Sequence, residues 1–323
     1  MNVDRIYSGS SVLVTGGAGF LGSHLVERLV SLNADVKILD NFSTGRDDNL
    51  NNVSARVKIV KGDIREKTVV ESAVDGCSIV FHLAAIPSVG VSIDDPSGTN
   101  QVNLSASSQL FKACGELGIN NVVFASTSAV YGVPERLPVT EDHHTRPVSP
   151  YGIQKLASEH YGFVFSQIHG YRFVALRFFN IYGPRQDSKN PHAAVIPRFV
   201  EALSNSRAPI IFGDGLQTRD FVYVSDAVDA LVLAGVSKTS GFFNVASGDS
   251  SSVMELVELL RELLGGPAPV HTSERVGDIK HSWADISLAR RHLDYSPSHN
   301  LEAGLKLYVE WVRLRGYPVH TCL

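Results

Sequence analysis

The chain has 323 residues, of which 44% are hydrophobic and 19% charged, an ordinary balance for a globular protein with a large core. Its formal net charge of −4 and the absence of a Lys/Arg-rich block exclude nucleic acid as an expected partner. The sequence contains neither the run of about 18 apolar residues that a membrane span needs nor a secretory signal, so we expect a cytoplasmic protein without a membrane partner.

The first predicted element is a strand that ends at Thr15 and runs into a glycine-rich turn. Residues 12–22 contain Gly16, Gly19 and Gly22 at G-x-x-G-x-x-G spacing, and apolar residues at helical spacing follow. Glycines between a strand and a helix allow a sharp turn and the close approach of a pyrophosphate, which the free N–H groups of the helix N-terminus can bind. The pattern predicts a dinucleotide site.

The next predicted strand, over 36–39, ends in a carboxylate at Asp40. Such a group can accept hydrogen bonds from both ribose hydroxyls of an adenosine, and it would repel a 2′-phosphate. We therefore expect NAD, rather than NADP, as the cofactor.

Strand-like and helix-like stretches alternate over the first 180 residues. Further strands are expected over 57–60, 79–82, 122–125 and 172–176, and helices near 65–75, 99–117 and 151–168. The alternation predicts an α/β fold: a Rossmann-type, doubly wound parallel sheet with ligands beyond the carboxyl ends of its strands.

After about residue 180, prolines divide the chain into shorter pieces, and helices are expected at 253–264 and at about 301–314. We expect residues 1–180 to form the dinucleotide-binding domain, with a later segment at about 220–247 interwoven with it. Residues 181–323 would mainly form a smaller C-terminal α/β lobe that binds the substrate.

Two groups suited to acid–base chemistry open the helix expected at 151–168. Tyr151 and Lys155 are four residues apart and share one helix face. An ammonium group beside a phenol stabilises the phenolate, and it can also hold the nicotinamide ribose. Ser126, Thr127 and Ser128 follow a strand, where a hydroxyl can share the substrate's proton with Tyr151. Alone, the Tyr–Lys pair would indicate a solvated helix face and the hydroxyl run a turn.

No metal site is expected. Cys77, Cys114 and Cys322 are scattered, which fits neither a disulfide framework nor a zinc cluster. His143 and His144 lie in a polar stretch without another ligand at metal spacing.

Together these elements resemble the extended short-chain dehydrogenase/reductase family, and within it the nucleotide-sugar epimerases and dehydratases. The resemblance covers nearly the whole chain and includes further motifs in a fixed order. They are Asp40-Asn-Phe-Ser-Thr-Gly45, Gly62-Asp63, His82-Leu-Ala-Ala85, Arg177-Phe-Phe-Asn-Ile-Tyr-Gly-Pro-Arg185, Gly213-Asp-Gly215, Arg219-Asp-Phe221 and Arg275-Val-Gly-Asp278. The resemblance implies an NAD-dependent UDP-sugar 4-epimerase, an isomerase that forms homodimers through the helices expected at 99–117 and 151–168.

The resemblance also implies the roles of individual residues. The catalytic residues would be Thr127, Tyr151 and Lys155. The cofactor would contact Gly16, Gly19, Phe20, Leu21, Asp40, Asn41, Ser43, Thr44, Gly45, Asp63, Ile64, Leu83, Ala84, Ala85, Ser126, Tyr151, Lys155 and Phe178. The UDP-sugar would contact Ser88, Thr127, Ser128, Asn180, Ala194, Val195, Arg198, Ile211, Phe212, Arg219, Arg275, Asp278 and Ser282.

Within the substrate set, the diphosphate is assigned to Asn180, Arg219 and Arg275, since arginine forks match phosphate oxygens. Phe212 would contact the uracil and Asp278 its ribose. A surface salt bridge is the alternative for each arginine.

The preferred reaction is C4 epimerisation through a 4-keto sugar, with hydride passing to NAD and returning to the other face of the sugar. In the related 4,6-dehydratases, Asp-Glu follows the catalytic threonine, whereas Ser128 and Ala129 follow Thr127 here, so dehydration is less favoured. Decarboxylation of a UDP-sugar acid is also less favoured. A non-catalytic NAD or nucleotide-sugar sensor is the alternative from another class, and the intact catalytic trio argues against it.

The sequence leaves the sugar open. By the resemblance, Ser282 borders the C2 substituent of the hexose, where a small side chain leaves room for an N-acetyl group, although plain packing beside Trp283 would also explain it. Residues 190–197 likewise resemble epimerases of N-acetylated sugars. Since an open pocket seldom rejects a smaller ligand, UDP-N-acetylglucosamine, UDP-glucose or both are expected. Arg185 could hold a carboxylate near C6, which keeps UDP-glucuronate as an alternative.

Overall fold

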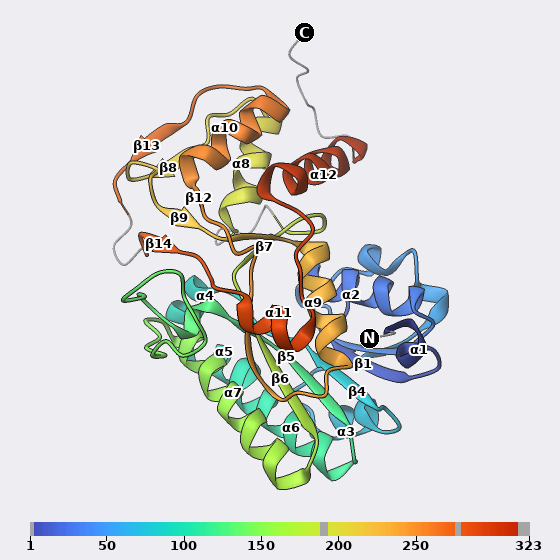
Figure 1. The fold of residues 1–323 in the computed structure, drawn as a ribbon. Coiled ribbons are helices and arrows are strands. Elements are labelled where there is room, and N and C mark those ends of the chain that lie inside the picture. Colours follow the sequence, from blue (N-terminus) through green and yellow to red (C-terminus); the bar gives the residue numbers. More distant parts are fainter. Residues whose placement is uncertain (1–2, 188–192, 275–278, 316–323) are drawn as a thin grey trace.

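The centre of the molecule is a seven-stranded sheet in which all neighbouring strands are parallel, in the order β11-β6-β5-β4-β1-β2-β3 (Figure 1). The computed structural model describes residues 3–187, 193–274 and 279–315. The sheet strands are β1 (Ser11–Thr15), β2 (Asp35–Asp40), β3 (Val57–Lys61), β4 (Ile79–His82), β5 (Asn121–Thr127), β6 (Arg172–Phe178) and β11 (Gly241–Val245). The prediction of a doubly wound parallel α/β fold is confirmed.

Helices cover both faces of this sheet, because the middle residues of its central strands are apolar and their side chains point alternately to the two faces. In β1, Leu13 packs with one face, and Val12 and Val14 pack with the other. The first face is covered by α3 (Lys67–Val74), α6 (Ser107–Glu116) and α7 (Pro150–His169). The opposite face is covered by α2 (Phe20–Ser31), α9 (Val224–Gly235) and α11 (Ser287–Leu293).

The helix expected over 99–117 is a composite of three pieces. It consists of α5 (Pro96–Asn100), the π-helical stretch η3 (Gln101–Ala106) and α6. Asn103 lies in the π-helical stretch, where its side chain donates to Gln154 Oε1 over 2.8 Å and accepts from the Ile86 N–H over 2.8 Å. These contacts tie the stretch to α7 and to the loop after β4.

Short helices complete this part of the chain. They are α1 (Val3–Tyr7), α4 (Val89–Asp94) and the 3₁₀ turns η1 (Asp47–Leu50), η2 (Ser54–Arg56) and η4 (Ser128–Val130). No helix in the described residues combines the length and the apolar composition that a membrane span requires.

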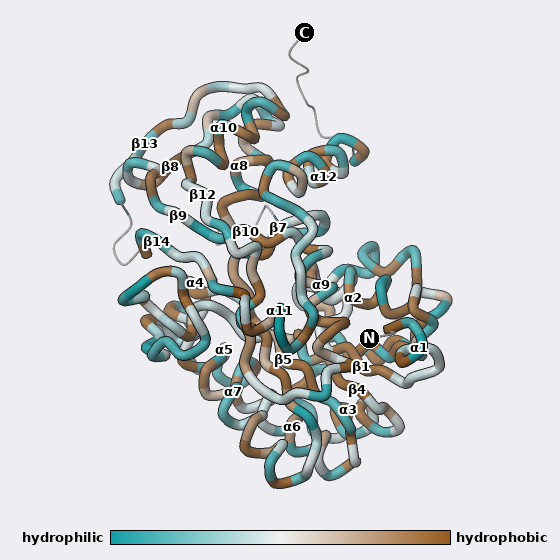
Figure 2. Tube along the Cα trace, in the orientation of Figure 1, coloured by the Kyte–Doolittle hydropathy of each residue, from teal (hydrophilic) through white to brown (hydrophobic). Residues whose placement is uncertain are grey.

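A second group of elements has its own core beyond the carboxyl edge of the sheet (Figure 1). Its helices are α8 (Val195–Ser204), α10 (Val253–Leu264) and α12 (Leu301–Leu314). The bounds of α10 and α12 match the predicted ranges. Buried residues at i, i+3, i+4 and i+7 spacing, such as Ile196, Phe199, Val200 and Leu203 of α8, make these helices amphipathic. Figure 2 shows apolar segments gathered at this interior and polar ones outside.

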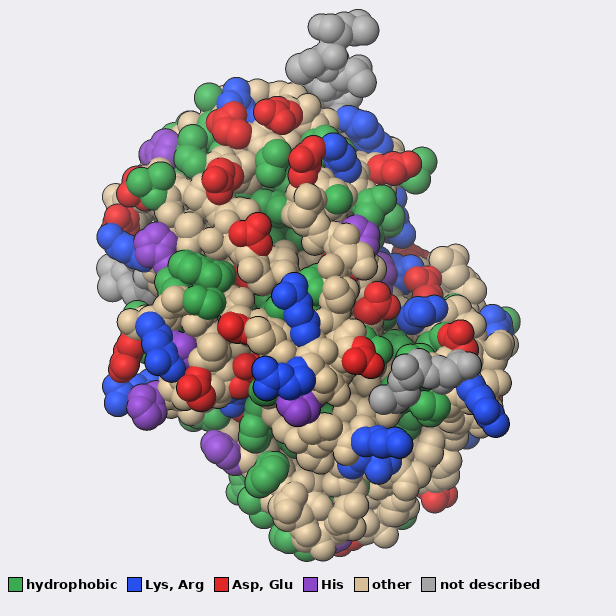
Figure 3. Space-filling model, in the orientation of Figure 1, with side chains coloured by type: hydrophobic (Ala, Val, Ile, Leu, Met, Phe, Trp, Pro, Cys, Tyr) green, Lys and Arg blue, Asp and Glu red, His purple; other side chains and the backbone are tan. Residues whose placement is uncertain are grey.

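Short strands pair within the second group of elements and beside it. β7 (Asn180–Tyr182) pairs with β10 (Phe221–Tyr223), and β8 (Ile210–Phe212) pairs with β13 (Val270–Thr272). β9 (Thr218–Arg219) lies between β12 (Ser251–Ser252) and β14 (His281–Ser282). On the face drawn in Figure 3, acidic and basic side chains are interspersed rather than gathered by sign.

Candidate active site

The glycine-rich turn forms between β1 and α2 as the sequence predicts, and its glycines leave no room for side chains. Gly16 has a φ of +72°, and a Cβ on it would lie 2.8 Å from the amide nitrogen of Ala84. A Cβ on Gly22 would lie 2.1 Å from the carbonyl oxygen of Gly16. The backbone is thus open toward the N-terminus of α2, which is the geometry a dinucleotide pyrophosphate requires.

A cavity of about 610 Å³ runs along the carboxyl ends of the central strands. All residues predicted to contact the cofactor line it except Gly45, which lies beside Asp40. Gly22 of the predicted turn also lines the cavity. Further lining residues, for which no cofactor contact was predicted, are Leu39, Gly62, Arg65, Ile86, Pro87, Asp95, Gly98, Val102, Ala125, Phe179, Ile181 and Gln186. Phe179 and Ile181 lie within the motif over 177–185 and could have been found from it.

Two carboxylates, Asp40 and Asp63, line the end of this cavity near the glycine turn, and both are hydrogen-bonded to neighbouring groups. Asp40 accepts from the backbone N–H groups of Ala18 and Phe42, over 2.9 and 2.8 Å, which fixes the end of β2 against the glycine turn. A carboxylate oxygen can accept a second hydrogen bond, so both remain able to meet ribose hydroxyls. Hydrogen bonds from Arg65 hold the pKa of Asp63 well below its usual range.

Thr127, Tyr151 and Lys155 come together in the same cavity. α7 starts at this point because Pro150 occupies its first turn and the Ser149 hydroxyl accepts from the Gly152 N–H over 3.1 Å. Burial raises the pKa of Tyr151 to about 12, and a hydrogen bond with Thr127 opposes that rise. Burial lowers the pKa of Lys155 to about 7, and the charge of Glu159 opposes that fall.

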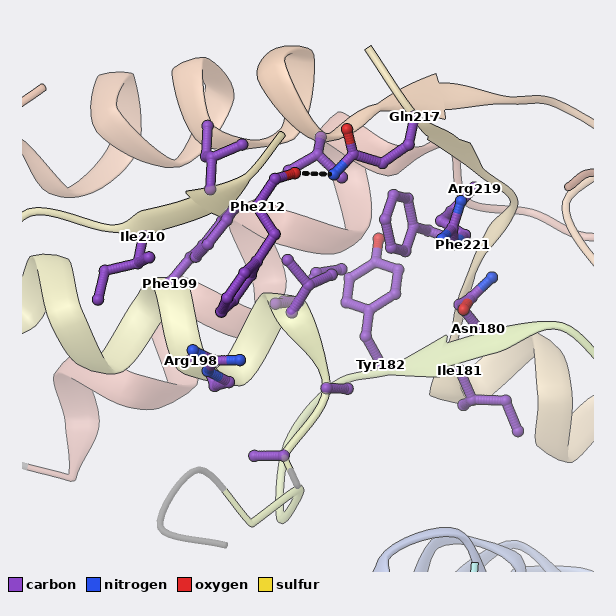
Figure 4. Close-up of a pocket in the computed structure, with 16 residues that line it drawn as sticks. Asn180, Ile181, Tyr182, Arg198, Phe199, Ile210, Phe212, Gln217, Arg219 and Phe221 are labelled. Atoms are coloured by element: carbon purple, nitrogen blue, oxygen red, sulfur yellow. Dashed lines mark hydrogen bonds between the residues drawn. The ribbon is translucent and has the colours of Figure 1, made fainter. Parts of the chain in front are cut away.

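A second cavity, of about 250 Å³, lies between the short strands and α8 (Figure 4). Seven residues predicted to contact the substrate line it: Asn180, Ala194, Val195, Arg198, Ile211, Phe212 and Arg219. The Arg198 guanidinium is 5.8 Å from the centre of the Phe212 ring, and Gln217 donates to the Phe212 carbonyl over 2.9 Å. In Figure 4, Asn180 and Arg219 lie at the opposite end from Arg198 and Phe212.

The two cavities adjoin, since Ile181 lines both. Together they form a path. The Phe212 ring lies at one end of the second cavity, Asn180 and Arg219 lie at its other end, and the Tyr151 cavity lies beyond them. The chemistry of this path suits a base, a diphosphate and a sugar in that order.

Other predicted substrate residues lie at the margins of these cavities. Ser88 caps α4 and accepts from the Val91 N–H over 3.2 Å, and Ser128 opens η4 directly after Thr127. Ser282 in β14 is the register partner of Arg219. None of the three lines either cavity in the described part of the chain. Arg275 and Asp278 lie outside the described residues.

A buried carboxylate within the motif Arg219-Asp-Phe221, for which no role was predicted, holds one side of the second cavity in place. Asp220, fully buried, accepts from the Ser247 N–H and hydroxyl over 2.7 and 2.6 Å and from Gly248 and Ala284 N–H groups over 3.1 and 3.3 Å. Its carbonyl accepts from the Asn180 backbone and side chain over 3.1 and 3.0 Å. Burial raises the pKa of Asp220 to about 6.

Arg185 is engaged away from both cavities. Its Nη2 is 2.6 Å from Glu27 Oε1 on α2, and Arg185 lines neither cavity. Within the described residues, no group of three His, Cys, Asp or Glu side chains is placed to hold a metal ion.

The chain is similar to known proteins over almost its entire length. Residues 12–246 match the model of the NAD dependent epimerase/dehydratase family. The chain is 38% identical, over 314 residues, to the UDP-glucose 4-epimerase of Mycolicibacterium smegmatis, covering 93% of this chain and 98% of that protein.

The chain is also similar to solved structures over almost its entire length. A UDP-N-acetylglucosamine 4-epimerase from Methanobrevibacter ruminantium, in complex with UDP-N-acetylmuramic acid, is 40% identical with a TM-score of 0.92, covering 95% of this chain and 99% of that one. A UDP-glucuronic acid 4-epimerase from Bacillus cereus, in complex with UDP-glucuronic acid and NAD, is 31% identical with a TM-score of 0.86. The match covers 94% of this chain and 99% of that one.

Proposed function

Because the chain belongs to the NAD dependent epimerase/dehydratase family, we propose that it is an isomerase that interconverts the C4 epimers of a UDP-hexose with NAD as a bound cofactor. The observation that carries this proposal is the meeting of Thr127, Tyr151 and Lys155 in the dinucleotide cavity, next to a cavity suited to UDP. The side-chain-free glycine turn fits the pyrophosphate of NAD.

In the proposed reaction, Tyr151 removes the proton of the C4 hydroxyl and later returns it. Lys155 favours the phenolate by its positive charge, and Thr127 hydrogen-bonds to Tyr151 and orients the same hydroxyl. When bound, NAD supplies the acceptor for the C4 hydride and gives the hydride back. Phe212, Asn180 and Arg219 retain the UDP portion while the keto sugar turns.

The substrates we propose are UDP-N-acetylglucosamine and UDP-N-acetylgalactosamine, UDP-glucose and UDP-galactose, or both pairs. The position of Arg185, which pairs with Glu27 and lines neither cavity, supports a neutral sugar over UDP-glucuronate. Dehydration is disfavoured because Ser128 and Ala129, in η4, supply no acid beside Thr127. We also propose that residues up to about 180 mainly bind NAD and that those beyond it mainly bind the UDP-sugar.

We further propose a homodimer formed through α6 and α7. The two helices pack side by side, and α7 carries the exposed apolar side chains Ile153, Val164 and Ile168, which are 56%, 52% and 66% exposed. A second copy would bury this face. Light scattering should give twice the chain mass, and Ile168→Asp should shift it toward the monomer.

A substrate panel tests the proposed activity. The purified protein is incubated with UDP-glucose, UDP-N-acetylglucosamine or UDP-glucuronate, and the C4 epimer is followed by proton NMR. We expect epimer to form from at least one of the two neutral sugars. Turnover of none of the three would contradict the enzyme assignment and favour a sensor, and turnover of UDP-glucuronate alone would overturn the proposed sugar.

A further inference from the structure

A third ionisable side chain follows Tyr151 and Lys155 on the catalytic face of α7. Glu159 is one helical turn beyond Lys155, at the same four-residue spacing, and is fully buried. It lines neither cavity in the described part of the chain, so the reaction proposed above does not use it directly. Burial of a carboxylate costs free energy unless the group is paired, so its partners indicate its role.

Two neighbouring strands hold this carboxylate in a fixed position. The Ser126 hydroxyl in β5 donates to Glu159 Oε1 over 2.5 Å. Arg177 in β6 donates from Nη2 to Oε2 over 2.7 Å and from Nε to Oε1 over 3.0 Å. Ser126 and Arg177 are register partners, and Ser126 directly precedes Thr127. Glu159 therefore ties the helix of Tyr151 to the strand of Thr127.

The arginine is itself held from its other side. Its Nη1 donates to the Tyr131 hydroxyl over 3.0 Å, and its guanidinium carbon is 4.9 Å from the centre of the Tyr131 ring. Tyr131 in turn donates to Asn244 Oδ1 over 2.6 Å. The position of the Glu159 carboxylate is thus determined by β5, β6 and β11 together rather than by the helix alone.

Lys155 is buried, and the aromatic face of Phe124 attracts its positive charge without carrying a charge of its own. It is 2% exposed, and its Nζ is 4.3 Å from the centre of the Phe124 ring. His82 faces the same region from β4, and burial, with a smaller effect from Lys155, lowers the His82 pKa to about 3, so this imidazole is neutral. Arg177 is positive, and Tyr131 beside it is an un-ionised phenol, because burial raises its pKa above its usual range. Among the described neighbours, Glu159 is the group whose charge favours the ammonium.

We propose that Glu159 is a positioning residue: its clamped carboxylate keeps the Lys155 side chain cationic and fixes Thr127 and Tyr151 relative to each other. The effect on turnover rests on the proposed function, whereas the effect on the charge of Lys155 does not. Glu159 acts through Lys155 and the tip of β5, and does not touch the sugar. Without its charge, the Lys155 ammonium would be buried with no opposing charge and would lose its proton at a lower pH.

The charge of Lys155 can be measured without turnover. In NAD-saturated protein labelled with ¹³C at lysine Cε, the Lys155 resonance is assigned by its loss in Lys155→Met. It should titrate well below solvent-exposed lysines, whose pKa lies near about 10.4. Glu159→Gln should lower its midpoint by about one to two pH units, as expected for removal of an opposite charge one helical turn away. Glu159→Asp keeps the charge and should retain most of the original midpoint.

Two further variants separate charge from folding. Glu159→Gln leaves Arg177 buried without a carboxylate, so Glu159→Gln/Arg177→Met removes both charges and should show the same direction of shift. Ser158→Ala is the matched control, because the Ser158 hydroxyl is a buried hydrogen-bond donor on the same helix, to the Asn103 carbonyl over 2.8 Å, and carries no charge. Its Lys155 midpoint should not move.

Turnover supplies the second measurement. The pH profile of kcat should have a midpoint at which Lys155 loses its proton. In Glu159→Gln this midpoint should fall by the same amount as the NMR midpoint. A Lys155 midpoint that stays in place in both Glu159→Gln and Glu159→Gln/Arg177→Met overturns the proposal, and so does a midpoint that moves while the pH profile of kcat does not. If the wild-type protein turns over none of the UDP-sugars, the proposed function fails, while the lysine titration still decides whether Glu159 holds the charge.

Discussion

Replacement of Tyr151 by phenylalanine tests the chemistry at its centre, because it removes one oxygen atom and leaves the ring in place. Burial raises the pKa of Tyr151 to about 12, so at pH 8 only about one phenol in 10⁴ is ionised before cofactor and substrate bind. The environment must therefore favour the phenolate during the reaction. General-base catalysis contributes about 10²- to 10⁴-fold, or roughly 3 to 5 kcal/mol of barrier.

Stability should change little in this variant. The ring is 9% exposed and keeps its contacts, and the lost hydrogen bond with Thr127 contributes about 1 kcal/mol. We expect kcat to fall at least 10²-fold, measured by proton NMR with the best UDP-sugar, while calorimetry gives a UDP-sugar Kd within about threefold of the wild type. The proposed UDP contacts come from Phe212, Asn180 and Arg219, which this change does not touch.

Tyr161→Phe is the matched control for that experiment. Tyr161 lies on the same helix, is 48% exposed and is remote from the cavity, so its hydroxyl should be dispensable. A Tyr151→Phe protein that keeps its rate within tenfold of the wild type would refute the assignment of the base. A fall in both variants would point to helix stability instead.

Three further variants test the cofactor turn, the UDP cavity and the sugar. Gly22→Ala should lower NAD affinity at least tenfold in a fluorescence titration, since its Cβ would lie 2.1 Å from the Gly16 carbonyl oxygen; unchanged affinity would count against the turn. Asp220→Asn should raise the KM for the UDP-sugar about tenfold, with kcat largely retained, because the amide cannot accept all four hydrogen bonds. Burial raises the folded-state pKa of Asp220 from 3.8 to about 6, so the wild-type protein loses stability as pH rises through 6 and this group ionises. Asp220→Asn lacks this loss, so its free energy of unfolding relative to the wild type should rise by about 3 kcal/mol between pH 3 and pH 7. A difference that stays constant with pH would refute this. Ser282→Tyr should lower kcat/KM for UDP-N-acetylglucosamine at least tenfold relative to UDP-glucose, and equal losses on both sugars would contradict a role at C2.

Features that depend on residues a few positions apart could be predicted from the sequence. The glycine turn follows from three glycines between a short apolar run and a helical repeat, and the bounds of α10 and α12 follow from apolar periodicity. Tyr151 and Lys155 share a face because a helix repeats every 3.6 residues. The alternation of strands and helices then leaves few topologies other than a doubly wound sheet.

The contacts between segments that are distant in the sequence became evident from the folded chain. Asp220 joins the backbone near Ser247 and Ala284, and Glu159 receives donors from β5 and β6. Arg185 could hold a carboxylate by its sequence context, yet it pairs with Glu27, 158 residues away. The helix expected over 99–117 contains a π-helical stretch where Asn103 bonds to Ile86 and Gln154. Each result depends on which buried polar groups find partners after the chain has packed, and local periodicity carries no information about such partners.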